Sequence, residues 1–239
     1  MNIAIDIGNT SIKAGVFDQS FLLKKHTVTG LSELYSLLNE IQPENLIVSS
    51  VRNNGEEVLA DHSINGAKLI LNSKLSLPIL NHYDTPETLG VDRIAAACGA
   101  NMMFPKQNVL VIDAGTCINY EFINNKGEYK GGAISPGVQM RFEAMHHFTA
   151  KLPNATPTQN FPLTGSNTLT SLQSGVMNGV LEEIKGTIAR YQSEYHDLRV
   201  ILCGGDAHFF ENHLNPTIFV APDLVLMGLN SILLYNVTS

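Results

Sequence analysis

The stretch that decides the fold is NIAIDIGNT, residues 2–10. Its apolar run is too short for a helix and predicts a buried strand over residues 2–7, with Asp6 near the end of that strand. Gly8 supplies the backbone freedom that a tight turn needs. The alternating residues that follow predict a second strand over 11–18, paired with the first in a hairpin. A carboxylate beside a turn rich in N–H donors suits a metal-bound polyphosphate.

A second copy of this pattern lies near the middle of the chain, where residues 108–116 read NVLVIDAGT. Asp6 lies 107 residues before Asp113. Gly8 lies the same 107 residues before Gly115. One Asp-x-Gly turn is ordinary hairpin chemistry and would carry no functional meaning alone. Two turns in the same register predict a duplicated domain.

Composition narrows the class of protein. The chain has 239 residues, is 44% hydrophobic and carries a net charge of −7, which is typical of a globular protein. A protein with this net negative charge would gain no affinity for DNA from the release of counterions. The sequence therefore favours small ligands over nucleic acid. The three cysteines are isolated, which argues against disulfides or structural zinc and favours a reducing, cytoplasmic location. Neither an export signal nor a membrane-spanning segment is expected.

The pattern of elements repeats along the chain. For the first half we expect strands at 2–7, 11–18, 21–28, 45–50 and 67–72 and helices at 31–41 and 54–65. For the second half we expect strands at 108–113, 117–123, 128–134, 198–203 and 217–220 and helices near 137–148, 168–195, from 206 and at 223–235. This order predicts an α/β protein with two duplicated βββαβαβ halves and a cleft between them.

The expected domain organisation has three parts. Residues 1–75 form the N-terminal half and residues 106–239 the C-terminal half. A bridging segment, 76–105, carries a polar loop and an alanine-rich helix.

Several motifs resemble those of a known superfamily. DIGNT, the internal DAGT and GGDA at 204–207 are similar to the two phosphate loops and the adenosine loop of sugar and acetate kinases, heat-shock chaperones and actin. Within it, DTPETLGVDR at 84–93, GGAISPG at 131–137 and NTLTSLQSG at 167–175 resemble the type III pantothenate kinase family. The resemblance covers essentially the whole chain, and it implies two duplicated ribonuclease H-like (βββαβαβ) halves with the active site in the cleft between them. It implies ATP-dependent phosphorylation of pantothenate to 4'-phosphopantothenate, the first step of coenzyme A biosynthesis, in a homodimer that needs a monovalent cation.

Asp92 is the candidate catalytic residue. Because it precedes an alanine-rich helix, it could act as an N-cap, a role that contributes about 1 kcal/mol. It could instead accept the proton of a substrate hydroxyl as a phosphoryl group arrives, as catalytic aspartates of kinases do. The resemblance assigns it as the general base.

Other residues are candidates for holding the acceptor. Arg93 offers a planar fork for a carboxylate, although a surface ion pair is the alternative reading. Tyr83 on its own reads as a core residue, and Asn167 or Thr168 reads as a helix cap. The resemblance implies substrate contacts at Tyr83, Gly90, Val91, Asp92, Arg93 and Thr168.

The nucleotide and cation sites are also implied by the resemblance. Asp113 would bind a monovalent cation, K⁺ or NH₄⁺, and Mg²⁺ would accompany ATP through Asp6. Lys13 is the only cation of the first loop and could face either phosphate or water. At three positions after the second loop the chain departs from the family pattern, with Cys117, Asn119 and Glu121 in place of a small residue, Thr and Asp. The implied ATP-binding residues are Asp6, Ile7, Gly8, Asn9, Thr10, Ser11, Ile12, Lys13 and Thr116.

Two other functions remain open at this point. A non-catalytic transcription accessory protein of the same fold would be favoured by degraded loops, whereas DIGNT, GVDR and DAGT are intact here. A phosphohydrolase of the same superfamily would activate water in place of a substrate alcohol.

Overall fold

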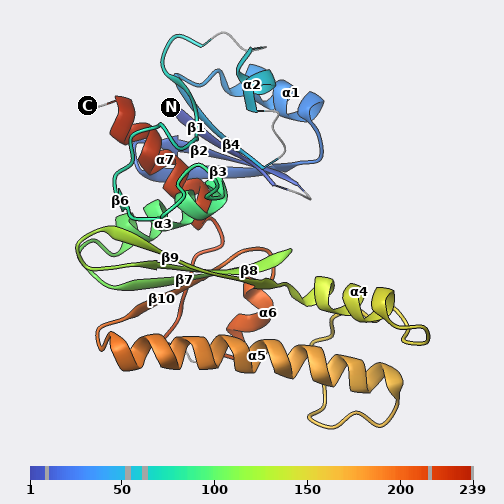
Figure 1. Ribbon diagram of the computed structural model, residues 1–239. Coiled ribbons are helices and arrows are strands. Elements are labelled where there is room, and N and C mark those ends of the chain that lie inside the picture. Colours follow the sequence, from blue (N-terminus) through green and yellow to red (C-terminus); the bar gives the residue numbers. More distant parts are fainter. Residues whose placement is uncertain (9–10, 52–54, 61–63, 215–216, 238–239) are drawn as a thin grey trace. The chain divides into compact units, whose positions relative to one another are not determined.

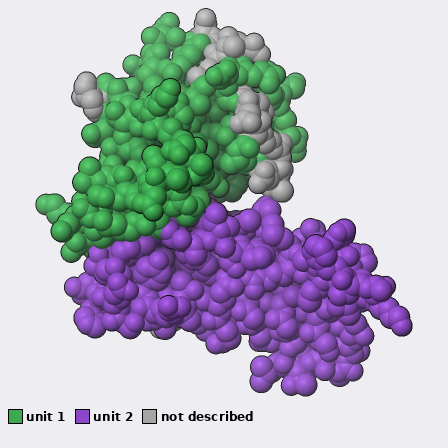
Figure 2. All heavy atoms as spheres, viewed as in Figure 1, with its two compact units in different colours: residues 1–107, 123–131, 223–239 green, residues 108–122, 132–222 purple. Residues whose placement is uncertain are grey.

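The computed structural model describes residues 1–8, 11–51, 55–60, 64–214 and 217–237, so the predicted site residues Asn9 and Thr10 lie outside the described residues. The chain forms two compact units, drawn in different colours in Figure 2. Unit 1 comprises Met1–Gln107, Ile123–Gly131 and Asp223–Ser239, and unit 2 comprises Asn108–Phe122 and Gly132–Pro222.

Unit 1 is built on a five-stranded sheet with the order β3-β2-β1-β4-β5. β1 pairs antiparallel with β2 and parallel with β4, so the predicted first hairpin is confirmed. The strands are β1 (Asn2–Ile7), β2 (Ile12–Asp18), β3 (Phe21–Val28), β4 (Asn45–Ser50) and β5 (Lys68–Ile70). The helices of this unit are α1 (Leu31–Ile41), α2 (Gly55–Ala60), α3 (Val91–Met103) and α7 (Leu224–Val237).

The two faces of this sheet are covered by different helices. Ile3, Ile5 and Ile7 share one face of β1 and pack with Leu34 and other buried residues of α1. α7 contacts β1, β4 and α3. A Cβ at Gly99 of α3 would lie 2.5 Å from the Leu224 carbonyl oxygen, so the two helices approach more closely than larger residues would allow. This packing fixes α3, whose first turn carries Asp92.

Unit 2 repeats the same strand order. Its strands follow the order β11-β10-β7-β8-β9, which corresponds to β5-β4-β1-β2-β3 of unit 1. β10 pairs parallel with both β7 and β11. The predicted duplication of the fold is therefore confirmed. The strands are β7 (Val109–Ala114), β8 (Cys117–Ile123), β9 (Glu128–Pro136), β10 (Arg199–Cys203) and β11 (Phe219–Val220). The last residue of β8 and residues 128–131 of β9 belong to unit 1.

The described residues of unit 2 include the helices α4 (Val138–Phe148), α5 (Thr168–Glu194) and α6 (Ala207–Glu211). Figure 1 shows α5 running along one face of the sheet. Its apolar side chains, from Leu172 to Ile188, pack with Leu110 and Ile112 of β7 to form the core of this unit. The core holds in place the turn at the end of β7.

The sequence predicts most elements but misses β6 (Leu80–Asn81), a two-residue strand that pairs parallel with the first residues of β9. Two residues are too few to show the alternation on which strand prediction depends. Of the helix predicted at 54–65, the structure assigns Gly55–Ala60, and residues 54 and 61–63 lie outside the described part. Among the described residues, no helix is both long and apolar enough to cross a membrane.

Candidate active site

In unit 1, several of the predicted site residues gather around Asp6 near the end of β1. In the sheet, Asp6 stands opposite Lys13 of β2 and Ser49 of β4. The hydroxyl of Ser49, which is fully buried, donates a hydrogen bond of 2.9 Å to Asp6 Oδ1. The Gly8 N–H donates to the Ser11 carbonyl at 3.1 Å. Strand pairing therefore holds the Asp6 carboxylate in one orientation.

The surroundings of Asp6 disfavour its negative charge. Burial raises the pKa of Asp6, the hydrogen bond from Ser49 and the charge of Lys13 oppose that rise, and the charge of Asp92 adds to it. A like-charge effect of this kind requires the two carboxylates to lie near each other. Unit 1 thus brings two acidic groups and one lysine together from β1, β2 and α3, an arrangement that can bind a cation together with a phosphate.

Asp92 lies in the first turn of α3, and Gly90 is the N-cap. Asp92 Oδ1 accepts a hydrogen bond of 2.9 Å from the N–H of Arg93. The N-cap role considered for Asp92 is therefore wrong, although the positive end of the helix still favours a negative charge there. A Cβ at Gly90 would lie 2.6 Å from Asp92 Oδ1. The glycine leaves room for the carboxylate.

Arg93 and Tyr83 form a pair beside this carboxylate. Arg93 is only 7% exposed, so the alternative of a surface ion pair is wrong. Its guanidinium carbon lies 5.5 Å from the centre of the Tyr83 ring, within the range of a cation–π interaction. Tyr83 is partly exposed and is not a core residue. Tyr83, Gly90, Val91, Asp92 and Arg93 all belong to unit 1.

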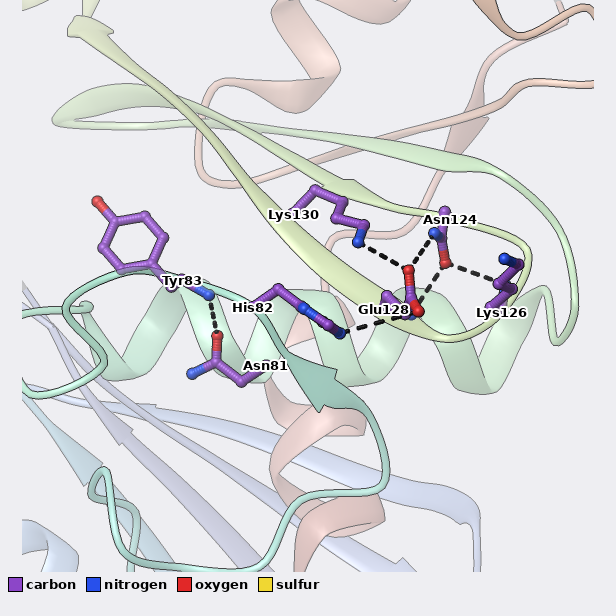
Figure 3. A network of polar contacts seen from close by, with 7 residues as sticks. All are labelled: Asn81, His82, Tyr83, Asn124, Lys126, Glu128 and Lys130. Carbon is purple, nitrogen blue, oxygen red and sulfur yellow. Dashed lines mark hydrogen bonds and ion pairs between the residues drawn. The ribbon is translucent and has the colours of Figure 1, made fainter.

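The backbone around Tyr83 is fixed by the β8–β9 hairpin, whose polar network is shown in Figure 3. Asn81 Oδ1 accepts a hydrogen bond of 3.0 Å from the Tyr83 N–H. Glu128 at the start of β9 pairs with Lys130 at 2.7 Å and accepts a hydrogen bond of 2.7 Å from Asn124. Nε2 of His82 lies 3.8 Å from Glu128 Oε1. Glu128 thus connects the hairpin to the segment that carries Tyr83.

We expect this network to make stability depend on acid pH. The hydrogen bonds from Lys130 and Asn124 lower the pKa of Glu128 from 4.5 to about 2. Because the folded-state pKa lies below the unfolded value, the stabilisation is complete above about pH 4.5 and is lost as the pH falls toward 2. Glu128→Gln should therefore lower the urea midpoint at neutral pH, and the difference from wild type should shrink between about pH 4.5 and pH 2.

A matched control is Glu182→Gln, which removes a largely exposed carboxylate paired with Lys185 at 3.0 Å. Exposed pairs of this kind contribute little, so this variant should unfold like wild type. If the difference in urea midpoint between Glu128→Gln and wild type stays constant down to about pH 2, the lowered pKa of Glu128 does not contribute to stability.

In unit 2, Asp113 near the end of β7 lies against the loop that carries Gly204. Gly204 has φ +91, and a Cβ there would overlap with Asp113 Oδ1 and the carbonyl oxygen of Ala114. The N–H of Asp206 donates to that same carbonyl at 2.9 Å. The DAGT and GGDA loops are therefore in contact. Carboxylate and carbonyl oxygens suit a hard cation, although no cluster of three His, Cys, Asp or Glu side chains is placed to hold a metal within the described part of the chain.

The second loop is braced by the start of α4. The N–H of Gly137 donates to the Thr116 carbonyl at 3.1 Å, and the Thr116 side chain is exposed. Arg141 Nε donates to the Pro136 carbonyl at 2.9 Å, and Arg141 Nη2 pairs with Glu183 at 2.6 Å. These contacts hold Thr116 in place at the surface of unit 2.

The remaining predicted residues of unit 2 lie in different environments. Thr168 is the exposed first residue of α5, and Asn167 is its cap, with Thr170 completing a capping box. Of the departures from the family pattern, Glu121 is fully buried, whereas Cys117 and Asn119 are partly exposed. Sequence reasoning missed Ser49, because a serine in a buried strand carries no signal of its partner.

The matching strand orders of the two units, with an aspartate near the end of the first strand of each, define the fold class of the two-domain sugar kinases. A glucokinase from an Antarctic psychrotroph superposes with a TM-score of 0.55 at 13% identity, covering 98% of each chain. A crystal structure from Campylobacter jejuni, described as a member of the Baf family of transcriptional activators, gives a TM-score of 0.67 at 22% identity, covering 99% of this chain and 100% of that one. At these identities the likeness shows the fold.

Sequence comparison resolves the family. The family described as type III pantothenate kinase matches residues 2–190. The type III pantothenate kinase of Cytophaga hutchinsonii is 46% identical over 242 residues, which cover 99% of this chain and 100% of that protein. The chain belongs to the type III pantothenate kinase family.

Proposed function

We propose that this protein transfers the γ-phosphoryl group of ATP to pantothenate and forms 4'-phosphopantothenate, the first step of coenzyme A biosynthesis, in the cytoplasm. The observation that carries the proposal is that the charge of Asp92, at the start of α3, helps to raise the pKa of Asp6 at the end of β1, beside Ser49 and Lys13. A kinase needs cation and phosphate ligands beside a base for the acceptor hydroxyl. Membership of the family supports the same reaction.

Asp92 is proposed as the general base that accepts the proton of the pantothenate hydroxyl as the phosphoryl group is transferred. Arg93 binds the pantothenate carboxylate through its planar guanidinium, and Tyr83 orients that group. Gly90, Val91 and Thr168 supply further substrate contacts. Positioning and charge neutralisation account for most of the rate enhancement.

For ATP we propose that the phosphates are held by the first loop and by Thr116. Asp6 holds Mg²⁺, directly or through water, and Lys13 faces the phosphates. Magnesium bound with ATP neutralises phosphate charge during transfer. The proposed ATP-binding residues are Asp6, Ile7, Gly8, Asn9, Thr10, Ser11, Ile12, Lys13 and Thr116.

We further propose a monovalent cation, K⁺ or NH₄⁺, at Asp113. The convergence of the Asp113 carboxylate and the Ala114 carbonyl on Gly204 supports this site, because hard cations prefer oxygen ligands. Replacing KCl by NaCl at constant ionic strength should lower the rate. Equal rates in both salts would refute the cation requirement.

A homodimer is also proposed. Ile134, Phe148 and Leu163 of unit 2 expose 63%, 82% and 85% of their surface. Contiguous apolar surface marks interaction sites, and these three side chains would contribute apolar area to an interface between two copies of the chain. Light scattering of the purified protein should give twice the chain mass of 26.0 kDa, and a monomer mass would reject the proposal.

The decisive experiment measures ADP release with and without pantothenate. A pantothenate kinase releases ADP only when the acceptor is present, and the product carries one added phosphate. ADP release that does not depend on the acceptor would indicate a phosphohydrolase. No release under any condition would favour a transcription accessory protein, which a DNA-binding assay then tests.

Ser49→Ala provides a test of the Asp6 environment. The Ser49 hydrogen bond lowers the pKa of Asp6 against the effect of burial, so its removal should raise that pKa further. Because the neutral carboxyl binds cations poorly, the acidic limb of the pH profile of kcat/KM for ATP should move to higher pH. At neutral pH, the loss should be about tenfold, which corresponds to one hydrogen bond to a charged group.

Ser50→Ala is the matched control, since neighbouring strand residues point to opposite faces of the sheet. Its pH profile should coincide with that of wild type. If the acidic limb of the pH profile does not shift in Ser49→Ala, the Ser49 hydroxyl does not lower the pKa of Asp6.

A further inference from the structure

Tyr129, near the start of β9, lies beside the proposed acceptor site although it is completely buried. β6 and β9 pair in parallel, with Leu80 opposite Glu128 and Asn81 opposite Tyr129. The N–H of His82 donates to the Tyr129 carbonyl at 3.1 Å. Tyr129 therefore binds the backbone of His82, the residue before Tyr83, and its ring also contacts the Tyr83 ring.

The rings of Tyr83 and Tyr129 are stacked, with centres 6.2 Å apart and planes inclined by 26°. The Arg93 guanidinium lies 5.5 Å from the centre of the Tyr83 ring. A Cβ at Gly131 would lie 3.3 Å from Cδ2 of Tyr83, so the glycine backbone also lies against this ring. The Tyr83 ring is thus in contact with groups from β9 and α3.

These contacts limit how Tyr83 can move. The Tyr83 N–H donates to Asn81 Oδ1 (Figure 3), and the N–H of the preceding residue, His82, donates to the Tyr129 carbonyl of the hairpin. The backbone here is therefore held in place, and the main remaining freedom of Tyr83 is rotation of its side chain. Stacking on Tyr129 and the close approach of the Gly131 backbone restrict that rotation, because another rotamer would lose the contact between the rings. A ring held in this way presents one face to the guanidinium of Arg93.

We infer that Tyr129 is a positioning residue for the acceptor site. Its ring holds Tyr83, and through Tyr83 the guanidinium of Arg93, in the orientation that binds the carboxylate of the acceptor. Tyr129 is buried and does not itself contact the acceptor. This inference rests on the proposed function, since it takes pantothenate as the acceptor that Arg93 binds.

The test compares Tyr129→Leu with Tyr129→Phe. Loss of the ring should raise KM for pantothenate about 3- to 10-fold, the range expected for one aromatic pair, while KM for ATP stays unchanged. Tyr129→Phe keeps the ring and should restore the wild-type KM. Calorimetric titration with pantothenate alone should show the same weakening for Tyr129→Leu. A Tyr129→Leu enzyme with unchanged KM and affinity for pantothenate would overturn the inference.

Phe122→Leu is the matched control, because Phe122 is a buried aromatic of neighbouring β8 that packs on Tyr191 and Tyr195. It should lower stability without changing KM for pantothenate. In a Tyr83→Leu background, Tyr129→Leu should cause no further rise in KM. A full additional rise there would mean that Tyr129 acts by another route, and this outcome also contradicts the inference.

Gly131→Ala provides a second variant if Tyr129→Leu does not fold. It keeps both rings, and its added methyl group would press on Tyr83 from a backbone with φ +91. KM for pantothenate should again rise, and an unchanged KM would contradict the inference. Failure of the proposed function is distinguishable, because wild type itself would then not phosphorylate pantothenate.

Discussion

Replacement of Asp92 by asparagine is expected to lower kcat for pantothenate phosphorylation by about 10²- to 10⁴-fold, the contribution of a positioned general base. Asparagine has the shape of aspartate, and its Oδ1 can still accept the hydrogen bond from Arg93 at the start of α3. The fold and the binding of ATP should therefore remain. ADP release measured with saturating pantothenate gives kcat, and calorimetry gives the affinity for ATP.

Asp84→Asn is the matched control for this variant. Asp84 is an exposed aspartate of the same polar loop, and its replacement should leave kcat near the wild-type value. If Asp92→Asn turns over within about threefold of wild type, then Asp92 is not the base, since that difference is below one kcal/mol.

Asp6→Asn should have opposite effects on activity and on stability. Loss of a carboxylate that holds Mg²⁺ beside the phosphates should reduce kcat/KM for ATP by about 10²-fold or more, the cost of removing one preorganised electrostatic contact. In the ligand-free protein, however, burial raises the pKa of Asp6, which means that the folded state disfavours the charge. The neutral asparagine should therefore raise the thermal midpoint at neutral pH.

The sign of this second effect follows from proton linkage. A carboxyl whose pKa is higher in the folded state keeps its proton up to a higher pH there than in the unfolded state. The stability of wild type therefore falls as the pH rises from the unfolded-state pKa through the folded-state pKa. Asp6→Asn should lack this fall in stability. Its higher thermal midpoint relative to wild type should therefore disappear at acid pH. Asp18→Asn, which changes an exposed aspartate at the end of β2, should change neither kcat/KM for ATP nor the thermal midpoint. A lower midpoint at neutral pH for Asp6→Asn would contradict the electrostatic description of the site.

The sequence predicts the architecture well because the two halves repeat one pattern of short apolar strands. The aspartates 107 residues apart stand near the ends of β1 and β7, which occupy corresponding positions in the two strand orders. The bounds of α1 and β4 agree with the predicted ranges, since periodic apolar residues and Pro43 mark them clearly.

Features that depend on packing between distant segments could not be predicted. Tyr83 and Tyr129 are 46 residues apart and meet only because β6, which has too little pattern to recognise, pairs with β9. The burial of Arg93 contradicts the usual exposure of arginine and follows from the position of α3. Likewise, the capping residue of α3 is a glycine with no side-chain signal.

Unit 1 contains residues from both ends of the chain, and this arrangement affects how it folds during synthesis. Gly228 of α7 lies so close to Ala95 of α3 that a methyl group would overlap with its carbonyl, and the two helices form the largest helix–helix contact of unit 1. On the ribosome, β1 and α3 emerge more than a hundred residues before the helix that covers them. Their apolar faces therefore stay uncovered while unit 2 is synthesised, and the nascent chain completes its N-terminal fold only after residues 224–237 have left the exit tunnel.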